Sequence, residues 1–410
     1  MMKLSIVIPA YNEEQAIGSI IERCLAARRG IIEQTALDAV EILVVSDGST
    51  DRTVEIARGY PDIRLIVFER NRGYGAAIQR GFEEASGDIL GFLDADGTCD
   101  PTFFATLCNA LVEEKAEVAI GSRMGPQSRM PRIRRIGNRI YAFILSVLSN
   151  KVVTDTASGM RVIRRDALPK LYPLPTGLHF TPAMSARVLM DERMTIVERP
   201  MTYEERVGES KLHVLRDGVR FLRTILEMTL MWRPAKLFRA AAFLCLFIVA
   251  VLTLHPVEQW LRSGRFEESM IYRLLFSSFL VTVGVSLLSA SVICDHIHRV
   301  FDPQAKPPSF LSALLDRVFT FRIHAVILVP ASVALVWLIG PGLWTRLTAG
   351  TVDVHWSRVM LAGLIAFTLG QSLLTVLIAN LLRFHVARRV SATPRIAPPI
   401  RAALAEVHSS

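Results

Sequence analysis

Residues 89–101 read Ile89-Leu90-Gly91-Phe92-Leu93-Asp94-Ala95-Asp96-Gly97-Thr98-Cys99-Asp100-Pro101. The apolar run at 89–93 predicts a buried strand, and Asp94 and Asp96 follow at its carboxyl end. Open α/β sheets bind their ligands at that edge. Two carboxylates at this spacing suit Mg²⁺ or Mn²⁺. A plain turn is the competing interpretation, because Asp and Gly are common turn residues.

Composition limits what the chain can be. Its 410 residues are 51% hydrophobic, the mean hydropathy is +0.35 and the net charge is +9. The basic excess suits nucleic acid or an anionic membrane surface, and long apolar runs after residue 235 favour the membrane. We therefore expect no nucleic-acid partner. The five cysteines form no CxxC pair and are expected to be reduced structural thiols.

Strands and helices alternate along the first half of the chain. Apolar segments predict further strands at 4–9, 41–45, 63–68 and 117–121. The helix after the first strand is expected to begin near Asn12, a suitable N-cap, and to run to about Arg28. Such alternation predicts a mostly parallel, doubly wound α/β sheet.

Polar residues follow three of these strands. Tyr11 and Glu13 come after the first, Asp47 after the second, and Asp94 with Asp96 after the strand at 89. Right-handed crossovers bring such strand ends to one edge of the sheet, so these side chains are expected to converge. One acid at a strand end is usually a cap, but the repetition favours a site.

Four motifs lie at the turns: Ile8-Pro9-Ala10-Tyr11-Asn12-Glu13-Glu14, Asp47-Gly48-Ser49-Thr50-Asp51, Asn71-Arg72-Gly73-Tyr74-Gly75 and Asp94-Ala95-Asp96-Gly97-Thr98. Together they resemble glycosyltransferase family 2, in particular its polyprenyl-phosphate hexosyltransferases. The resemblance covers about residues 3–230. It implies a GT-A fold that binds a nucleotide-sugar.

The resemblance also implies roles for individual residues. Those at the nucleotide-sugar are Pro9, Tyr11, Glu13, Asp47 and Asp94. Asp94 and Asp96 are implied as the ligands of the divalent ion, Mg²⁺ or Mn²⁺. Thr98 stands where the family often has a further polar ligand.

Basic segments mark the expected acceptor side. The residues 202–212 again resemble the polyprenyl-phosphate branch, and Arg206 and Lys211 would form a cationic loop over the diphosphate and the acceptor phosphate. With Arg123 they are expected to screen the two anions. Arginines at 129–139 lead into an apolar run, an amphipathic stretch that suits an anionic membrane surface. A solvated basic face is the alternative.

No carboxylate occurs in residues 177–184, where many family members carry a general base. A hydroxyl acceptor needs such a base, whereas a phosphate monoester is already largely dianionic at pH 7. The absence of this carboxylate therefore favours a polyprenyl phosphate acceptor. We expect a single, inverting displacement at the anomeric carbon. The expected catalytic residues are Asp96, Arg123, Arg206 and Lys211. His179 is the alternative base, although a lone His is more often structural.

The second half of the chain predicts an all-α membrane domain. Uncharged stretches of spanning length lie at about 237–257, 274–294, 325–345 and 359–382. We expect a cytoplasmic GT-A domain at 1–211, an amphipathic interfacial helix at 212–234, four transmembrane helices within 235–385 and a flexible tail at 386–410. Lys and Arg concentrate at 220–239, at 295–324 and in the tail, which predicts cytoplasmic termini in the inner membrane.

Several alternatives stay open. A processive polysaccharide synthase would normally carry Gln-x-x-Arg-Trp, which is missing. A membrane protein that only binds nucleotide-sugars is the non-enzymatic alternative. The sequence does not choose between UDP-glucose and GDP-mannose types of donor, nor between a monomer and a homo-oligomer.

Overall fold

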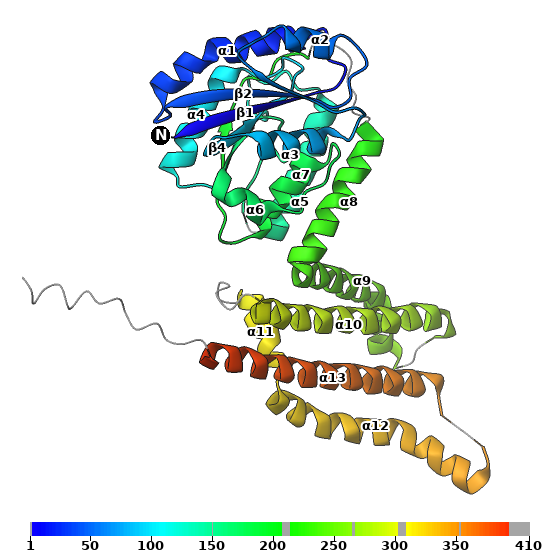
Figure 1. The fold of residues 1–410 in the computed structure, drawn as a ribbon. Coiled ribbons are helices and arrows are strands. Elements are labelled where there is room, and N and C mark those ends of the chain that lie inside the picture. Colours follow the sequence, from blue (N-terminus) through cyan, green and yellow to red (C-terminus); the bar gives the residue numbers. More distant parts are fainter. Residues whose placement is uncertain are drawn as a thin grey trace, which may run out of the picture. The chain divides into compact units, whose positions relative to one another are not determined.

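The computed structural model describes residues 2–149, 151–206, 214–264, 267–301, 309–351 and 354–392 (Figure 1). Lys211 lies outside these residues. The chain divides into two compact units, 1–233 and 234–410. Each unit is described by itself.

The first unit is built on a seven-stranded sheet of order β3-β2-β1-β4-β6-β5-β7. The strands are β1 (Lys3–Ala10), β2 (Ala39–Ser46), β3 (Arg64–Val67), β4 (Ile89–Phe92), β5 (Val118–Ser122), β6 (Arg161–Arg164) and β7 (Ile196–Pro200). Only β6 runs antiparallel to its neighbours, β4 and β5. The predicted mostly parallel α/β sheet is confirmed, while β6 and β7 were not predicted.

Helices cover both faces of the sheet (Figure 1). The alternation of β1 sends Leu4, Ile6 and Ile8 into one core, with α1 (Ile17–Gln34) and α4 (Phe104–Glu113), and Val7 into the other. That second core contains α3 (Tyr74–Glu84) and α7 (Phe180–Met190). Each large apolar side chain buried there contributes about 1.5–3 kcal/mol. Short helices complete the unit: α2 (Thr53–Arg58), η1 (Pro101–Phe103), η2 (Arg165–Ala167) and α6 (Leu168–Leu171).

The expected helix start at Asn12 is wrong. Helix α1 begins at Ile17 and continues to Gln34, six residues beyond Arg28. Asn12 has a left-handed backbone (φ 50), and its Oδ1 accepts a hydrogen bond from Thr50 N at 2.8 Å. A contact with the second strand's loop thus replaces the N-cap.

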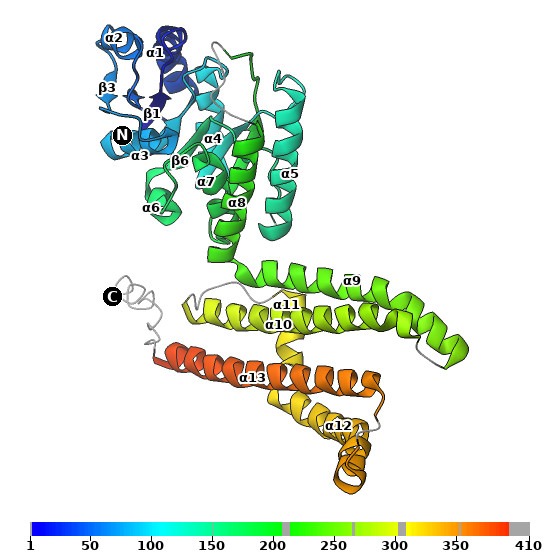
Figure 2. The same cartoon turned by 90° about the vertical axis from the view of Figure 1, so that its right-hand side faces the viewer.

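Two amphipathic helices pack side by side next to α7 (Figure 2). They are α5 (Arg132–Ser149) and α8 (Val214–Trp232). The Tyr141 and Phe221 rings meet edge to face, and the Tyr141 hydroxyl donates to the Gly218 carbonyl at 2.8 Å. Both helices also expose apolar side chains, including Ile136, Phe143, Val219 and Met231.

The second unit is helical. Its helices are α9 (Pro234–Ser263), η3 (Glu268–Met270), α10 (Ile271–Phe301), α11 (Phe310–Val318), α12 (Phe321–Ala349) and α13 (Trp356–Ala392). Four segments, 234–263, 268–301, 321–349 and 356–385, are long and apolar enough to cross a membrane, and each contains one of the expected spans. Helix α10 packs against α9 and α13, and α12 packs against α13. Helix α13 continues to Ala392, so the first residues of the tail expected at 386–410 are helical, in keeping with the high helix propensity of Ala and Arg at 387–389; the remainder of that tail lies outside the described residues.

Candidate active site

A pocket of about 500 Å³ opens at the carboxyl ends of β1, β2 and β4. The topology brings the three polar strand ends together, as the sequence predicted. Every expected site residue that the structure describes lines this pocket: Pro9, Tyr11, Glu13, Asp47, Asp94, Asp96, Arg123 and Arg206.

Asp47 holds the loop at residues 71–73. Its two carboxylate oxygens accept from the N–H groups of Arg72 (2.7 Å) and Gly73 (2.9 Å). Burial raises the pKa of Asp47, although these hydrogen bonds oppose the shift. Gly73 has φ 106, and a Cβ there would lie 2.5 Å from the Thr176 carbonyl oxygen. The loop at 71–73 is therefore fixed in shape by Asp47 and by a position that favours glycine.

Asp94 and Asp96 each have one carboxylate oxygen engaged from inside the protein. The Tyr74 hydroxyl donates to Asp94 Oδ1 at 2.7 Å, and the Thr98 hydroxyl donates to Asp96 Oδ1 at 2.7 Å. Burial, and next the charge of Asp96, raise the pKa of Asp94 to about 7. Two acids in such surroundings repel each other, so a cation between them would be stabilising.

The donor set fits Mg²⁺ or Mn²⁺. Within the part of the chain that the structure describes, no third His, Cys, Asp or Glu joins the two acids in a metal-binding group. Thr98, considered as a third ligand, is fully buried and bonded to Asp96. Mg²⁺ commonly binds through one or two carboxylates and completes its octahedron with water and substrate phosphates.

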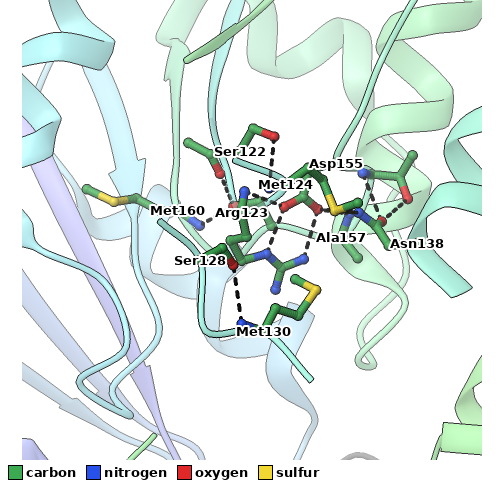
Figure 3. A network of polar contacts seen from close by, with 12 residues as sticks. Ser122, Arg123, Met124, Ser128, Met130, Asn138, Asp155, Ala157 and Met160 are labelled. Atoms are coloured by element: carbon green, nitrogen blue, oxygen red, sulfur yellow. Dashed lines mark hydrogen bonds and ion pairs between the residues drawn. The ribbon is translucent and has the colours of Figure 1, made fainter. Parts of the chain in front are cut away.

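Arg123 is held by Asp155 (Figure 3). Its Nε and Nη2 donate to the two carboxylate oxygens, both at 2.8 Å, and Asn138 of α5 donates to the same carboxylate at 3.1 Å. Burial alone would raise the pKa of Asp155, but the Arg123 guanidinium and its hydrogen bonds lower it. The expected screening role of Arg123 stays a prediction, and the structure adds that Asp155 already compensates its charge.

Arg206 lines the pocket beside Glu13 and Asp96. It forms an ion pair with Glu13 at 2.9 Å and lies 3.9 Å from Asp96. Its segment is tied down because Glu204 N donates to the Thr98 carbonyl at 2.9 Å. A cation thus lies next to Glu13 and Asp96.

The pocket continues toward α5 and α8. Arg134 and Arg220 line this part together with apolar side chains, namely Ile133, Tyr141, Leu178 and Phe221. His179, the alternative base, is not among the lining residues. Sequence reasoning missed Arg220, whose spacing from Arg216 and Arg223 indicated only an amphipathic helix. It also missed Tyr74, which stood in a quoted motif without a role.

The chain is similar in sequence to several known proteins. The family model "Glycosyl transferase family 2" matches residues 5–172. A low-salt glycan biosynthesis hexosyltransferase of Haloferax volcanii is 34% identical over 258 residues, 61% of this chain and 58% of that protein. The dolichyl-phosphate hexose transferase of the same organism is 32% identical over 232 residues, 55% of this chain and 94% of that protein.

Two further matches extend the comparison. An undecaprenyl-phosphate 4-deoxy-4-formamido-L-arabinose transferase of Photorhabdus laumondii is 25% identical over 325 residues, 76% of this chain and 94% of that protein. A glucosyl-3-phosphoglycerate synthase of Mycobacterium tuberculosis, solved with Mn²⁺, UDP and glucosyl-3-phosphoglycerate, aligns with a TM-score of 0.42 and 22% identity, over 56% of this chain and 79% of that one.

A relative that is 32% identical along nearly its whole length establishes the class of protein, and the chain is a glycosyltransferase. It belongs to glycosyltransferase family 2, in the branch of the polyprenyl-phosphate transferases. The matched region contains most of β1 and all of β2 to β6, and with them Asp94 and Asp96, which follow β4.

Proposed function

We propose that this protein transfers a hexose from a nucleotide-sugar to the phosphate of a polyprenyl phosphate, with inversion and with a divalent metal ion. One observation carries the proposal: a single pocket joins two acids at a sheet edge to an arginine-containing, apolar part between α5 and α8. The first part suits a nucleoside diphosphate with its cation. The second suits a phosphate attached to an apolar chain.

On the donor side, Pro9, Tyr11, Glu13 and Asp47 are proposed to hold the nucleoside. Asp94 and Asp96 would hold a divalent ion on the diphosphate. An ion bound there would stabilise the leaving nucleoside diphosphate as a Lewis acid. Arg206, which lies beside Asp96, would contact the diphosphate oxygens.

On the acceptor side, Arg134 and Arg220 are proposed to bind the phosphate. The adjacent rings of Tyr141 and Phe221 would contact the first isoprene units. The exposed apolar faces of α5 and α8 suit a membrane surface, from which a long prenyl chain can enter the pocket.

The pocket's acids argue for a phosphate acceptor. Among the described lining residues the acidic ones are Glu13, Asp47, Asp94 and Asp96. Glu13 pairs with Arg206, and the other three accept hydrogen bonds from Arg72 and Gly73, from Tyr74 and from Thr98. A hydroxyl acceptor would need one of them as a base, whereas a phosphate dianion attacks without losing a proton.

The proposed reaction is one displacement. A phosphate oxygen of the acceptor forms a bond to the anomeric carbon, and the bond from that carbon to the nucleoside diphosphate breaks. Arg123, Arg206 and Lys211 are proposed to screen the two anions. The orientation follows the Lys and Arg bias, with the first unit and both termini cytoplasmic in the inner membrane.

Membranes containing the protein are to be incubated with UDP-glucose or GDP-mannose, Mn²⁺ and undecaprenyl or dolichyl phosphate, and the lipid products identified by mass spectrometry. We expect one inverted hexosyl phosphate lipid, and Asp96→Asn should reduce its formation at least 100-fold. A polymeric product would instead support a processive synthase. Nucleotide-sugar binding without transfer would support a binding protein, and either result contradicts the proposal.

A further inference from the structure

Tyr74 is the first residue of α3, and its position is set by the backbone around it. Gly73 N donates to Asp47, and Ala76 N donates to the Thr176 carbonyl at 3.0 Å. A Cβ at Gly75 would lie 2.3 Å from the Pro175 carbonyl oxygen, so the helix start is packed tightly against residues 175–176. The backbone that carries the half-buried Tyr74 side chain is therefore held in place.

The Tyr74 hydroxyl donates to Asp94 Oδ1 at 2.7 Å. Gly159 borders the other oxygen, because a Cβ at Gly159 would lie only 1.9 Å from Asp94 Oδ2. The carboxylate of Asp94 is thus held between the Tyr74 hydroxyl and Gly159, which are far from each other in the sequence.

Asp96 is held in a similar way, by a hydroxyl group only two residues away in the sequence. Thr98 donates its hydroxyl (2.7 Å) and its N–H (3.2 Å) to Asp96 Oδ1. Hydroxyl donors orient a carboxylate without neutralising it, unlike an arginine or a lysine. One oxygen of each acid is therefore held in place by an uncharged donor, so the charge of the ionised carboxylates is left for a cation.

We propose that Tyr74 is a positioning residue for the divalent cation: its hydroxyl fixes the Asp94 carboxylate in the orientation that binds the ion. This inference rests on the proposed metal-dependent transfer. Hydrogen-bond partners of metal ligands typically contribute a factor of 10 to 100 to metal affinity. Tyr74 would act through Asp94 and need not touch either substrate.

The test is Mn²⁺ binding to the full chain in detergent, measured by the loss of the free Mn²⁺ signal in electron paramagnetic resonance. Tyr74→Phe should weaken Mn²⁺ binding about 10- to 100-fold. Tyr60→Phe is the matched control, since Tyr60 is also half-buried and donates to a carboxylate, that of Glu22, at 2.9 Å. Its Mn²⁺ affinity should equal that of the wild type.

Transfer assays provide a second readout. If only metal affinity is lost, raising the Mn²⁺ concentration should restore the kcat of Tyr74→Phe, which a merely structural defect would not allow. Thr98→Val, which removes the hydroxyl on Asp96, should also weaken Mn²⁺ binding and tests the same idea should Tyr74→Phe not fold. Wild-type affinity in the folded Tyr74→Phe or Thr98→Val variant overturns the inference, whereas no Mn²⁺ binding by the wild type contradicts the proposed metal site itself.

Discussion

The Arg206 guanidinium lies 2.9 Å from the carboxylate of Glu13 and 3.9 Å from that of Asp96. Glu13 follows β1 and Asp96 follows β4, so one cation bridges two neighbouring strand ends. A diphosphate offers Arg206 more charge and more acceptor oxygens than Glu13 does. We expect Arg206 to exchange Glu13 for the diphosphate when the nucleotide-sugar binds.

Arg206→Gln should therefore lower kcat/KM for the nucleotide-sugar about 10- to 100-fold, the usual factor for a lost hydrogen bond to a charged group. Steady-state kinetics with the donor that proves active measures this. Arg199→Gln is the control, because Arg199 pairs with Glu114 on the protein surface and does not line the pocket. Unchanged donor kinetics in Arg206→Gln would refute the exchange.

Gly159→Ala tests the contact on Asp94 directly. The added Cβ would lie 1.9 Å from Asp94 Oδ2, so the carboxylate must move. A misplacement of about 1 Å in an active site can cost about 100-fold in rate. We expect a loss of that order in transfer activity, measured as lipid-linked hexose formed per enzyme.

Gly30→Ala controls for the effect of adding a methyl group. Gly30 lies within α1, where the nearest atom to a new Cβ is Gln34 Nε2 at 3.9 Å. This variant should keep full activity and gain about 0.5–1 kcal/mol of stability, because alanine is the better helix former. Equal activity of the two variants would contradict a special role for Gly159.

Hydrophobic pattern and topology rules predicted much of this site. Apolar runs gave the strands, and parallel strands end at one edge, so Tyr11, Asp47 and Asp94 had to converge. The four long apolar helices were predictable, because a stretch of about twenty mostly apolar residues without charge is typical of a membrane-spanning helix. These inferences need only local sequence and a general rule of chain geometry.

The features that the sequence did not predict depend on contacts between distant segments of the chain. Tyr74 meets Asp94 from a different helix, and no spacing in the sequence encodes a hydroxyl pointing at a carboxylate. Helix α1 starts late because Asn12 bonds to Thr50, a tertiary contact that overrides a local signal. Strand β6 inserts antiparallel between β4 and β5 and is only four residues long, too short for a periodicity to show.

Asp155→Asn should destabilise the first unit. Asp155 is fully buried and is the ion-pair partner of the nearly buried Arg123, so the amide would leave a buried cation without compensation. Breaking such a pair costs about 3–5 kcal/mol. Asp166→Asn is the control, since Asp166 pairs with Arg164 on the surface and should matter by less than about 1 kcal/mol. Equal thermal unfolding of the two variants would contradict this ranking.

The same pair predicts a dependence of stability on pH. The pKa of Asp155 is held below its ordinary 3.8 by Arg123. A carboxyl group with a lowered folded-state pKa stabilises the fold above its unfolded pKa, and this contribution is lost as the pH falls through the folded-state value. The wild type should therefore lose more thermal stability than Asp155→Asn as the pH falls from about 4, near the ordinary pKa of aspartate, toward the lower folded-state pKa of Asp155. Parallel curves for the two proteins would argue against the pair.

Phe143→Glu tests whether the exposed apolar face of α5 contacts the membrane. Phe143 is 70% exposed although it is a large apolar residue, and Ile136 and Ile140 on the same helix are also exposed. A carboxylate there would be repelled by an anionic membrane surface and would lose the buried apolar area. We expect KM for undecaprenyl phosphate in vesicles to rise about tenfold or more, the factor for a loss of about 1.4 kcal/mol.

A short, water-soluble prenyl phosphate separates this effect from damage to the pocket, because it needs no membrane to enter the proposed phosphate site at Arg134 and Arg220. Its KM should stay unchanged in Phe143→Glu. Val112→Glu provides the matched substitution, since Val112 is 47% exposed on α4 and does not line the pocket. If Val112→Glu raises the KM for undecaprenyl phosphate as much as Phe143→Glu does, general loss of stability explains both results and α5 is not the membrane face.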